Sequence, residues 1–195
     1  MIIQQHKGKR IFITGIPTSG KSYLAEKLAE TLGGIAVLFD DFREDLRETE
    51  QYEKWVNFYL DQDEKEYITN TSPEKQWENL VAQSEGLWPA FLQEIEKYKD
   101  EEKPVIFECV NLLPYLAKKD LDFPGIVLIG KSYEETLVRN IQSPRWGETL
   151  ELQKLEAKMF FENERPHYKA EAEKYGYPVF ESADEAFEKA LILLL

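Results

Sequence analysis

The chain has 195 residues, of which 43% are hydrophobic, and its 37 acidic side chains outnumber the 24 basic ones to give a formal net charge of -13. This balance argues against a nucleic-acid or anionic-membrane partner, because such surfaces attract clustered Lys and Arg. The single cysteine, Cys109, excludes an internal disulfide and suits a reducing compartment. No stretch approaches the ~20 apolar residues that span a bilayer, and the N-terminus (MIIQQHKGKR) lacks the apolar region of a signal peptide. We therefore expect one cytoplasmic domain over residues 1–195.

Short β-rich runs alternate with longer helical stretches along the chain, which is the pattern of a parallel sheet wrapped by helices. The runs are apolar without strict alternation, as expected for strands that are covered on both faces. They are Arg10–Thr14, Ile35–Phe39, Pro104–Glu108, Ile126–Ile129 and Pro178–Glu181. The sequence predicts an α/β fold of three layers, α/β/α, around a five-stranded parallel sheet. The C-terminal run LILLL is predicted to end a last helix that packs on this sheet.

The first predicted strand runs into a complete G-x-x-x-x-G-K-[ST] phosphate-binding loop. The loop and the residue after it are Gly15, Ile16, Pro17, Thr18, Ser19, Gly20, Lys21, Ser22 and Tyr23. Gly15 and Gly20 let the backbone curl so that consecutive N–H groups point at a phosphate, and the helix that follows adds its positive end. Lys21 is expected to bridge the β- and γ-phosphates of ATP, and the Ser22 hydroxyl to ligate Mg²⁺.

Acidic residues follow two of the later strands. Asp40 and Asp41 come after the second strand, with Arg43 close behind, and Glu108 ends the third. Because the carboxyl ends of parallel strands meet at one edge of the sheet, these side chains should lie beside the phosphate loop. An acid there can accept a proton from an attacking hydroxyl or help to hold Mg²⁺. The alternative is that these acids cap the following helices, and it fits Asp41 better than Asp40 or Glu108. We assign Asp40, Asp41 and Arg43 to the substrate side.

The stretch 42–100 is too long for a simple crossover, and it is charged, rich in aromatic residues and largely helical. We interpret it as an acceptor-side insertion over the sheet edge, split into two helices at Asn70–Pro73, with Ser72 as an N-cap. Its aromatic residues are Tyr52, Trp55, Phe58, Tyr59, Trp77 and Trp88. They could stack on a base or a sugar, but their helical spacing favours a role in the core.

A second helical stretch, residues 143–175, separates the fourth and fifth strands and is interpreted as a lid that is helical throughout. Arg139 and Arg145 lie at its entry. A planar guanidinium suits a trigonal phosphoryl group, which makes both arginines candidate catalytic residues. Arg139 could instead form a surface ion pair with Glu134 or Glu135.

These segments resemble the uridine kinase and nicotinamide riboside kinase group of P-loop kinases. GIPTSGKSYLA is similar to the loop and helix of that group, FDDFRED to its acceptor strand end, VIFECVNLL to its third strand and SYEETLVRNIQSPRW to its lid entry. The resemblance implies that Asp40 is the catalytic base, that Glu108 helps to hold Mg²⁺, and that Arg139 and Arg145 clamp the transferring phosphoryl group. The chain departs from the group at Cys109, where the group has Gly.

The leading interpretation is an enzyme that uses ATP and Mg²⁺ to phosphorylate a hydroxyl of a small molecule, nucleoside-like or another metabolite. A nucleoside monophosphate kinase, whose acceptor is itself a phosphate, is a second possibility, although the D-G-x-P-R signature is missing after Phe107. A third is a switch protein that binds ATP without transferring its phosphate. The N/T-K-x-D guanine motif is absent, and Glu108 lacks the preceding Asp of motor-type ATPases. Both absences favour transfer over GTP hydrolysis or mechanical work.

Overall fold

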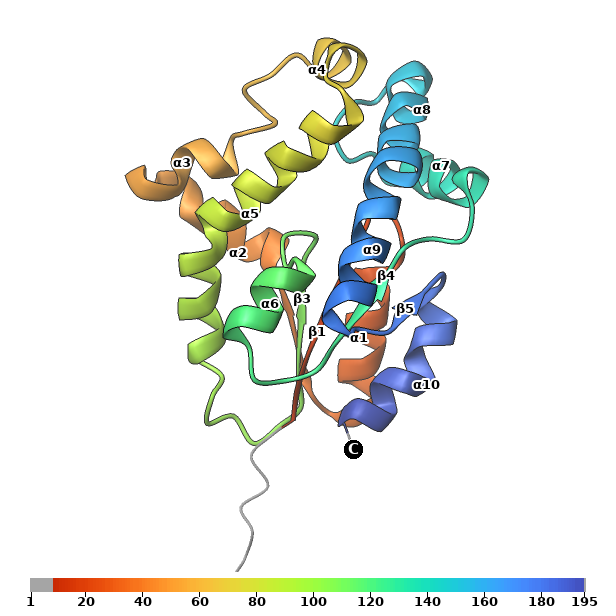
Figure 1. The fold of residues 1–195 in the computed structure, drawn as a ribbon. Helices are drawn as coiled ribbons and strands as arrows, with labels where there is room; N and C mark the ends of the chain where they lie inside the picture. The colour runs from red at the N-terminus through yellow and green to blue at the C-terminus, as the bar shows by residue number, and fades with distance from the viewer. Residues whose placement is uncertain (1–8, 195) are drawn as a thin grey trace, which may run out of the picture.

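Figure 1 shows the protein as a computed structural model, which describes residues 9–194. Within this range the strands form one parallel sheet of five strands in the order β2-β3-β1-β4-β5. They are β1 Arg10–Gly15, β2 Ile35–Leu38, β3 Val105–Glu108, β4 Gly125–Leu128 and β5 Val179–Phe180. The five predicted strands are confirmed, with ends that differ by at most one residue. The expectation about the N-terminal segment MIIQQHKGKR falls mostly on residues 1–8, which lie outside the described range.

Helices cover both faces of this sheet, so the predicted three-layer α/β/α fold is confirmed (Figure 1). The helices are α1 Lys21–Leu32, α2 Phe39–Asp45, α3 Glu50–Val56, α4 Glu64–Asn70, α5 Pro73–Glu96, α6 Pro114–Asp120, α7 Tyr133–Gln142, α8 Leu150–Lys158, α9 Arg165–Tyr175 and α10 Ala183–Leu194, together with a 3₁₀ turn Leu46–Glu48 (η1) and a π-helical turn Met159–Glu164 (η2). Among the described residues, no helix combines the length and the apolar character needed to cross a bilayer.

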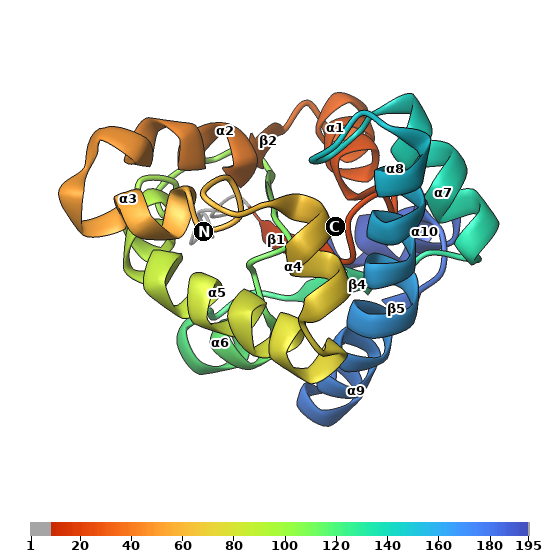
Figure 2. The same ribbon diagram turned by 90° about the horizontal axis from the view of Figure 1, so that it is seen from above.

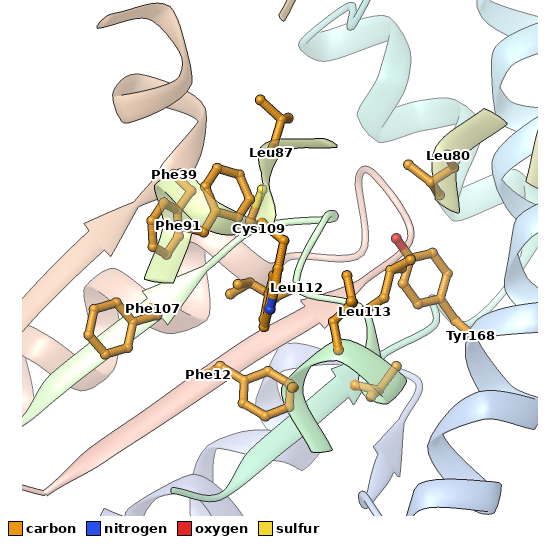
Figure 3. Packing of buried hydrophobic residues seen from close by; sticks show 14 of the residues in the cluster. Phe12, Phe39, Leu80, Leu87, Phe91, Phe107, Cys109, Leu112, Leu113 and Tyr168 are labelled. Carbon is orange, nitrogen blue, oxygen red and sulfur yellow. The ribbon is translucent and has the colours of Figure 1, made fainter. Parts of the chain in front are cut away.

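The strands feed two separate cores, one on each face of the sheet. Ile11 and Ile13 of β1 belong to the core under α1 and α10, whereas Phe12 between them belongs to the core under α5, α6 and α9. Figure 3 shows the second core, where Phe12 lies among other buried side chains, including Phe39, Phe91, Phe107, Leu112 and Tyr168. As predicted, the C-terminal run ends α10, and Leu194 is buried in the first core. Leu195 lies outside the described residues.

The insertion differs from the prediction in its first half. The break at Asn70–Pro73 is confirmed, because α4 ends at Asn70 and the Ser72 side chain accepts a hydrogen bond from Lys75 N at 3.2 Å at the start of α5. Before this break, however, the chain forms α2, η1, α3 and α4 instead of one helix. Helix α2 also takes over Phe39, which the sequence predicted as the end of the second strand. The Phe39 ring packs 4.5 Å from that of Phe91, so tertiary packing holds it in the helix.

The lid region also differs from the prediction, because residues 143–149 are not helical. Helix α8 begins only at Leu150, where Thr149 caps its N-terminus by accepting a hydrogen bond from Leu152 N at 3.3 Å. From α8 the chain continues through η2 into α9 as one rod. Viewed from above in Figure 2, α4 and α8 lie next to one another over the carboxyl edge of the sheet. The insertion and the lid region therefore meet above the phosphate loop.

Candidate active site

The phosphate loop between β1 and α1 has the backbone that its glycines allow. Gly15 has φ of 128°, and a Cβ atom there would lie 1.8 Å from the carbonyl oxygen of Leu128. Gly20 has φ of 93° and Thr18 has φ of 59°, both in the left-handed region that favours glycine. The loop thus curls against β4, where Ile16 N donates a hydrogen bond to the carbonyl oxygen of Leu128 at 3.1 Å, and it leads directly into the N-terminus of α1. A loop of this kind before a helix N-terminus is the arrangement that binds phosphates.

Lys21 and Ser22 join this loop to the end of β3. Lys21 Nζ donates a hydrogen bond to the carbonyl oxygen of Ile16 at 2.8 Å and lies 3.9 Å from Oε1 of Glu108. The Ser22 hydroxyl donates to the other carboxylate oxygen of Glu108, Oε2, at 2.9 Å. Lys21 and Glu108 are both buried, at 5% and 4% exposure. The shared edge of the parallel strands therefore brings together the three residues that the sequence predicted to lie side by side.

The donor set at this point fits a magnesium ion. Burial raises the pKa of Glu108 and lowers that of Lys21, since each charged form loses water, while their mutual attraction opposes both shifts. The Ser22 hydroxyl and the Glu108 carboxylate are oxygen ligands of the kind that Mg²⁺ prefers. In residues 9–194, no group of three or more His, Cys, Asp or Glu is arranged to hold a metal ion. Mg²⁺ in nucleotide sites needs few protein groups, since phosphates and water complete its shell.

Asp40 lies on the first turn of α2, half exposed at 48%, with its Oδ1 3.2 Å from Nη2 of Arg43. Arg43 also donates from Nη1 to Oδ1 of Asn111 at 3.3 Å. The Asn111 side chain is fully buried and donates from Nδ2 to Gln83 Oε1 at 3.1 Å and to Ser84 Oγ at 2.9 Å, both on α5. An ion pair and hydrogen bonds therefore connect the Asp40 carboxylate, through Arg43 and Asn111, to α5.

The capping alternative for Asp41 is wrong. Helix α2 has Leu38 as its N-cap and no side-chain cap hydrogen bond, and Asp40 and Asp41 both lie in its first turn. Negative charge there interacts favourably with the helix dipole. Cys109, the departure from the resembled group, is buried, and its Sγ lies 4.0 Å from Oδ1 of Asp40. The thiol thus lies next to the carboxylate that the sequence singled out.

Two cavities open on either side of the phosphate loop. The first, of about 570 Å³, lies between the loop, α7 and the start of α10, and we call it the α7 cavity. The second, of about 460 Å³, lies between the insertion and the lid region, and we call it the insertion cavity. Lys21, Ser22 and Arg145 line both. The two cavities therefore meet at a lysine, a hydroxyl and an arginine.

The walls of the insertion cavity are acidic and aromatic. Its carboxyl groups are those of Asp40, Asp41, Glu44, Glu108, Glu156 and Glu164, and its cations are Lys21, Arg43 and Arg145. Its apolar walls include Tyr59, Leu60, Trp146, Met159 and Phe160. Carboxyl groups thus outnumber cations two to one, and two of those cations also border the α7 cavity.

The two candidate arginines lie in different surroundings. Arg145 is exposed in the non-helical turn before α8 and borders both cavities. Arg139 lines the α7 cavity, where its guanidinium pairs with Glu135 and donates from Nη1 to the carbonyl oxygen of Thr18 at 3.1 Å. The ion pair that the sequence left open for Arg139 is therefore present. Through its bond to Thr18, the same side chain also contacts the backbone of the phosphate loop.

The aromatic residues of the insertion serve the core for the most part, as the sequence favoured. Tyr52 and Trp88 are buried, and Trp77 stacks on His167 with ring centroids 4.8 Å apart. Tyr59 is the exception, because it lines the insertion cavity. Its ring meets that of Trp146 edge to face, with centroids 5.8 Å apart.

Several cavity residues were not predicted from the sequence. Asn111 and Gln83 are found only through the buried contact between them, since both read as ordinary polar residues. Glu156 and Glu164 lie eight positions apart on the rod formed by α8 and η2, hidden among other acidic residues of the lid region. Glu164 lies on a π-helical turn, a conformation that is frequent at functional sites in proteins and is not evident in sequence patterns.

No protein-family model matches the chain, and no curated protein matches it in sequence. Solved structures do resemble its fold. Shikimate kinase from Acinetobacter baumannii in complex with shikimate has a TM-score of 0.55 and 16% identity, over 96% of this chain and 93% of that one. TT1252 from Thermus thermophilus has a TM-score of 0.55 and 17% identity, over 96% and 98%. Deoxyadenosine kinase from M. mycoides with bound dATP has a TM-score of 0.50 and 14% identity, over 94% and 97%.

These similarities extend over nearly the whole chain, and they show that it has the fold of small P-loop kinases. The identities of 14–17% show the fold alone, so the chemistry has to be argued from the residues of this chain.

Proposed function

We propose that the protein is an ATP-dependent kinase that transfers the γ-phosphoryl group to a hydroxyl of a small molecule. One observation carries this proposal, namely that the α7 cavity and the insertion cavity meet at Lys21, Ser22 and Arg145. A phosphoryl-transfer enzyme needs a donor pocket and an acceptor pocket with cationic groups where they join. A switch that only senses ATP has no need of the second pocket.

In this proposal the nucleotide lies in the α7 cavity with its phosphates over the loop, where the backbone N–H groups of Thr18 to Ser22 would face them. Lys21 neutralises the β- and γ-phosphates, and Arg145 stabilises the charge on the transferring group. Arg139 keeps the loop in shape through its bond to Thr18. Mg²⁺, when bound by Ser22 and Glu108 together with the phosphates, would supply further charge neutralisation.

The acceptor lies in the insertion cavity with its reacting hydroxyl near Asp40. The hydroxyl oxygen forms a bond to the γ-phosphorus, the bond from that phosphorus to the bridging oxygen of ADP breaks, and the hydroxyl proton passes to the Asp40 carboxylate. Arg43 supports this role, because its ion pair and its bond to Asn111 hold the carboxylate in one orientation. Asp41 and Arg43 are further candidate contacts for the acceptor.

The acidic walls of the insertion cavity make a phosphate acceptor the weaker alternative. A nucleoside monophosphate kinase must bind a dianionic acceptor, and its pocket needs cations that are not engaged by ATP. Here Arg43 already pairs with Asp40, and Lys21 and Arg145 also line the α7 cavity, in which we place the nucleotide. The narrower resemblance to the uridine kinase and nicotinamide riboside kinase group remains a prediction that a shared fold does not test.

Calorimetric titration of ATP with Mg²⁺, combined with measurement of ADP formation in the presence and absence of pooled hydroxyl compounds, tests this function. We expect ATP to bind and ADP formation to rise at least ~10-fold when the pool contains an acceptor, as a transfer enzyme requires. Tight ATP binding with no stimulation by nucleosides, sugars, amino alcohols or hydroxy acids would instead identify a switch protein.

A further inference from the structure

Arg145, which borders both cavities, lies in the stretch 143–149, which is neither helix nor strand. We call this stretch the arginine turn. The Arg145 side chain is exposed, so its place where the cavities join depends on what holds the backbone of the turn. The turn leads from α7 into α8, and α8 lies next to α4 of the insertion (Figure 2). Two buried carboxyl groups, one on α4 and one on α8, face the turn.

The first of these carboxyl groups is that of Glu64 on α4, which is 8% exposed. The turn approaches it so closely that a Cβ atom on Gly147 would lie 2.2 Å from Oε2 of Glu64. Burial raises the pKa of Glu64, and the backbone N–H of Gly147 opposes that shift by stabilising the charged form. The arginine turn therefore meets α4 at a residue without a side chain, and its backbone supplies a polar group that faces the buried acid.

The second carboxyl group is that of Glu156 on α8, which is 1% exposed. Its Oε2 accepts a hydrogen bond from Nδ2 of Asn140 on α7 at 2.7 Å, which fixes its orientation. Burial raises the pKa of Glu156 to about 7, and the Asn140 bond opposes that shift. The charge of Glu64 adds to the shift, whereas the backbone N–H of Trp146 and the charge of Arg145 oppose it. Glu156 thus interacts electrostatically with two residues in the middle of the turn.

The side chain of Trp146 attaches the turn to the insertion as well. Its ring meets that of Tyr59 edge to face, with centroids 5.8 Å apart, and its centroid lies 5.9 Å from that of Tyr67. On the other side of the turn, Gln153 of α8 donates from Nε2 to the carbonyl oxygen of Glu148 at 3.0 Å. The arginine turn is therefore held from the insertion and from α8 together.

Burying a carboxyl group costs free energy unless polar or charged groups face it. Several of the groups that face these two acids belong to the arginine turn, so the acids are best stabilised when the turn lies where the structure has it. We therefore infer that Glu64 and Glu156 are positioning residues, which hold the backbone of the arginine turn so that Arg145 lies where the two cavities join. The inference rests on the proposed kinase function, because it names the residues that place a charge at the site of transfer.

Steady-state kinetics at pH 8 tests this role. Glu64→Leu and Glu156→Leu remove the carboxyl groups with little change in side-chain volume. Each should lower kcat at least ~10-fold while KM for ATP changes less than ~2-fold, because a displaced Arg145 weakens mainly the transition state. The thermal midpoint of each variant shows whether it remains folded.

Conservative variants at the same positions should restore much of the activity. Glu64→Gln keeps an oxygen that can face the Gly147 N–H, and its kcat should stay within ~3-fold of the wild type. Glu156→Gln keeps an oxygen for the Asn140 bond and loses only the charge that faces Arg145. It should fold even if Glu156→Leu does not, and its kcat should lie at least ~3-fold below that of the wild type.

A double-substitution cycle separates positioning from a general loss of structure. If the two acids act through Arg145, Glu64→Leu and Glu156→Leu should lower kcat less than ~2-fold in a protein that already carries Arg145→Ala. Lys65→Met is the matched control for the contact between α4 and α8. It removes the exposed ion pair of Lys65 with Glu151, 2.8 Å long, and should leave kcat within ~2-fold of the wild type.

Hydrogen exchange gives a readout that needs no turnover. The backbone N–H groups of Trp146 and Gly147 face the two acids. Peptides that cover residues 143–149 should therefore exchange at least ~5-fold faster in Glu64→Leu and Glu156→Leu than in the wild type, because the turn opens more often. The Lys65→Met control should exchange at the wild-type rate.

The outcomes separate this inference from the proposed function. Folded Leu variants with wild-type kcat or wild-type exchange of the turn would overturn the inference. Losses of kcat that are as large with Arg145→Ala present as without it would overturn it too. In each of these cases phosphoryl transfer by the wild type would leave the kinase proposal standing. Faster exchange of the turn in the Leu variants, with no transfer by the wild type to any compound, would uphold the anchoring of the turn and refute the kinase.

Discussion

The phosphate loop and the insertion cavity adjoin at Lys21, which belongs to the loop and lines the cavity. The sequence nevertheless encodes the two regions in different ways. The loop consists of eight consecutive residues, and its shape follows from two glycines and the start of a helix. The insertion cavity takes its walls from α2, the end of α3 and the α3–α4 connection, α5, the end of β3, the turn before α8, α8 itself and η2, besides residues of the phosphate loop. A local motif can be identified by itself, whereas a wall built from distant segments appears only when the chain is folded.

The largest expected effect comes from a substitution in the phosphate loop, the locally encoded region. Lys21→Ala should lower phosphoryl transfer by about 10³–10⁵-fold, the range found for charged groups that neutralise a transferring phosphoryl group. Steady-state transfer with the best acceptor measures it. The fold should survive, because the thermal midpoint depends on the two cores and not on the loop. Lys118→Ala, exposed on α6, is the matched control. Normal turnover by Lys21→Ala would remove the loop from the chemistry.

Substitutions of the two arginines test which of them acts at the point where the two cavities join. Arg145→Ala should lower kcat by about 10²–10³-fold with little change in KM for ATP, because its charge acts on the transition state. Arg139→Ala should lose less, and mainly in ATP affinity, because it contacts the loop backbone and not the insertion cavity. Measuring kcat and KM for both variants separates the roles. A larger loss of kcat in Arg139→Ala would reverse them.

The smallest expected effect lies in the acidic wall and concerns stability. The pKa of Glu164 is about 8 in the folded chain against a reference of 4.5, so the folded state holds a proton that the unfolded state loses between these values. Stability therefore falls as pH rises through this window. Glu164→Gln removes that loss, and its thermal midpoint relative to wild type should be higher at pH 8 than at pH 5.

For a chain of this size, a difference of ~1 kcal/mol in the free energy of unfolding corresponds to about 2–4 °C in the thermal midpoint. We expect the thermal midpoint of Glu164→Gln, relative to that of the wild type, to rise by at least this amount between pH 5 and pH 8. Thermal unfolding of Glu164→Gln and Glu162→Gln at pH 5 and pH 8 would measure it. Identical pH dependence in wild type and Glu164→Gln would show that Glu164 is not held in its neutral form by burial.

The contrast between the two regions also explains what could be predicted from the sequence. The five strands and the loop follow from short-range apolar runs and one motif, and the contact of Ser22 with Glu108 follows from the parallel sheet. The bonds of Asn111 to α5 could not be predicted, because they join residues 27 and 28 positions apart with no distinctive spacing.

The predicted helix boundaries were wrong where tertiary contacts override the local preference of the sequence. Residues 143–149 have no helix although their neighbours do, and Gly147 lies against Glu64 of the insertion so closely that a Cβ atom there would be 2.2 Å from Glu64 Oε2. This contact between insertion and lid region leaves Arg145 in a turn and not on a helix. That Arg145 lines both cavities therefore depends on tertiary contacts and could not be predicted from local sequence.

Asp40 gives the most direct test of the central claim that a local donor site and a non-local acceptor site meet at one transfer centre. The measurement is the ATP dissociation constant and the rate of ³²P transfer from γ-labelled ATP, both determined on one preparation of Asp40→Asn. We predict unchanged ATP affinity and a transfer rate lower by about 10²–10⁴-fold, the usual contribution of a general base. Asp41→Asn should transfer at a rate much closer to wild type. Transfer at the wild-type rate by Asp40→Asn, or no transfer by the wild type to any acceptor despite tight ATP binding, would contradict the account.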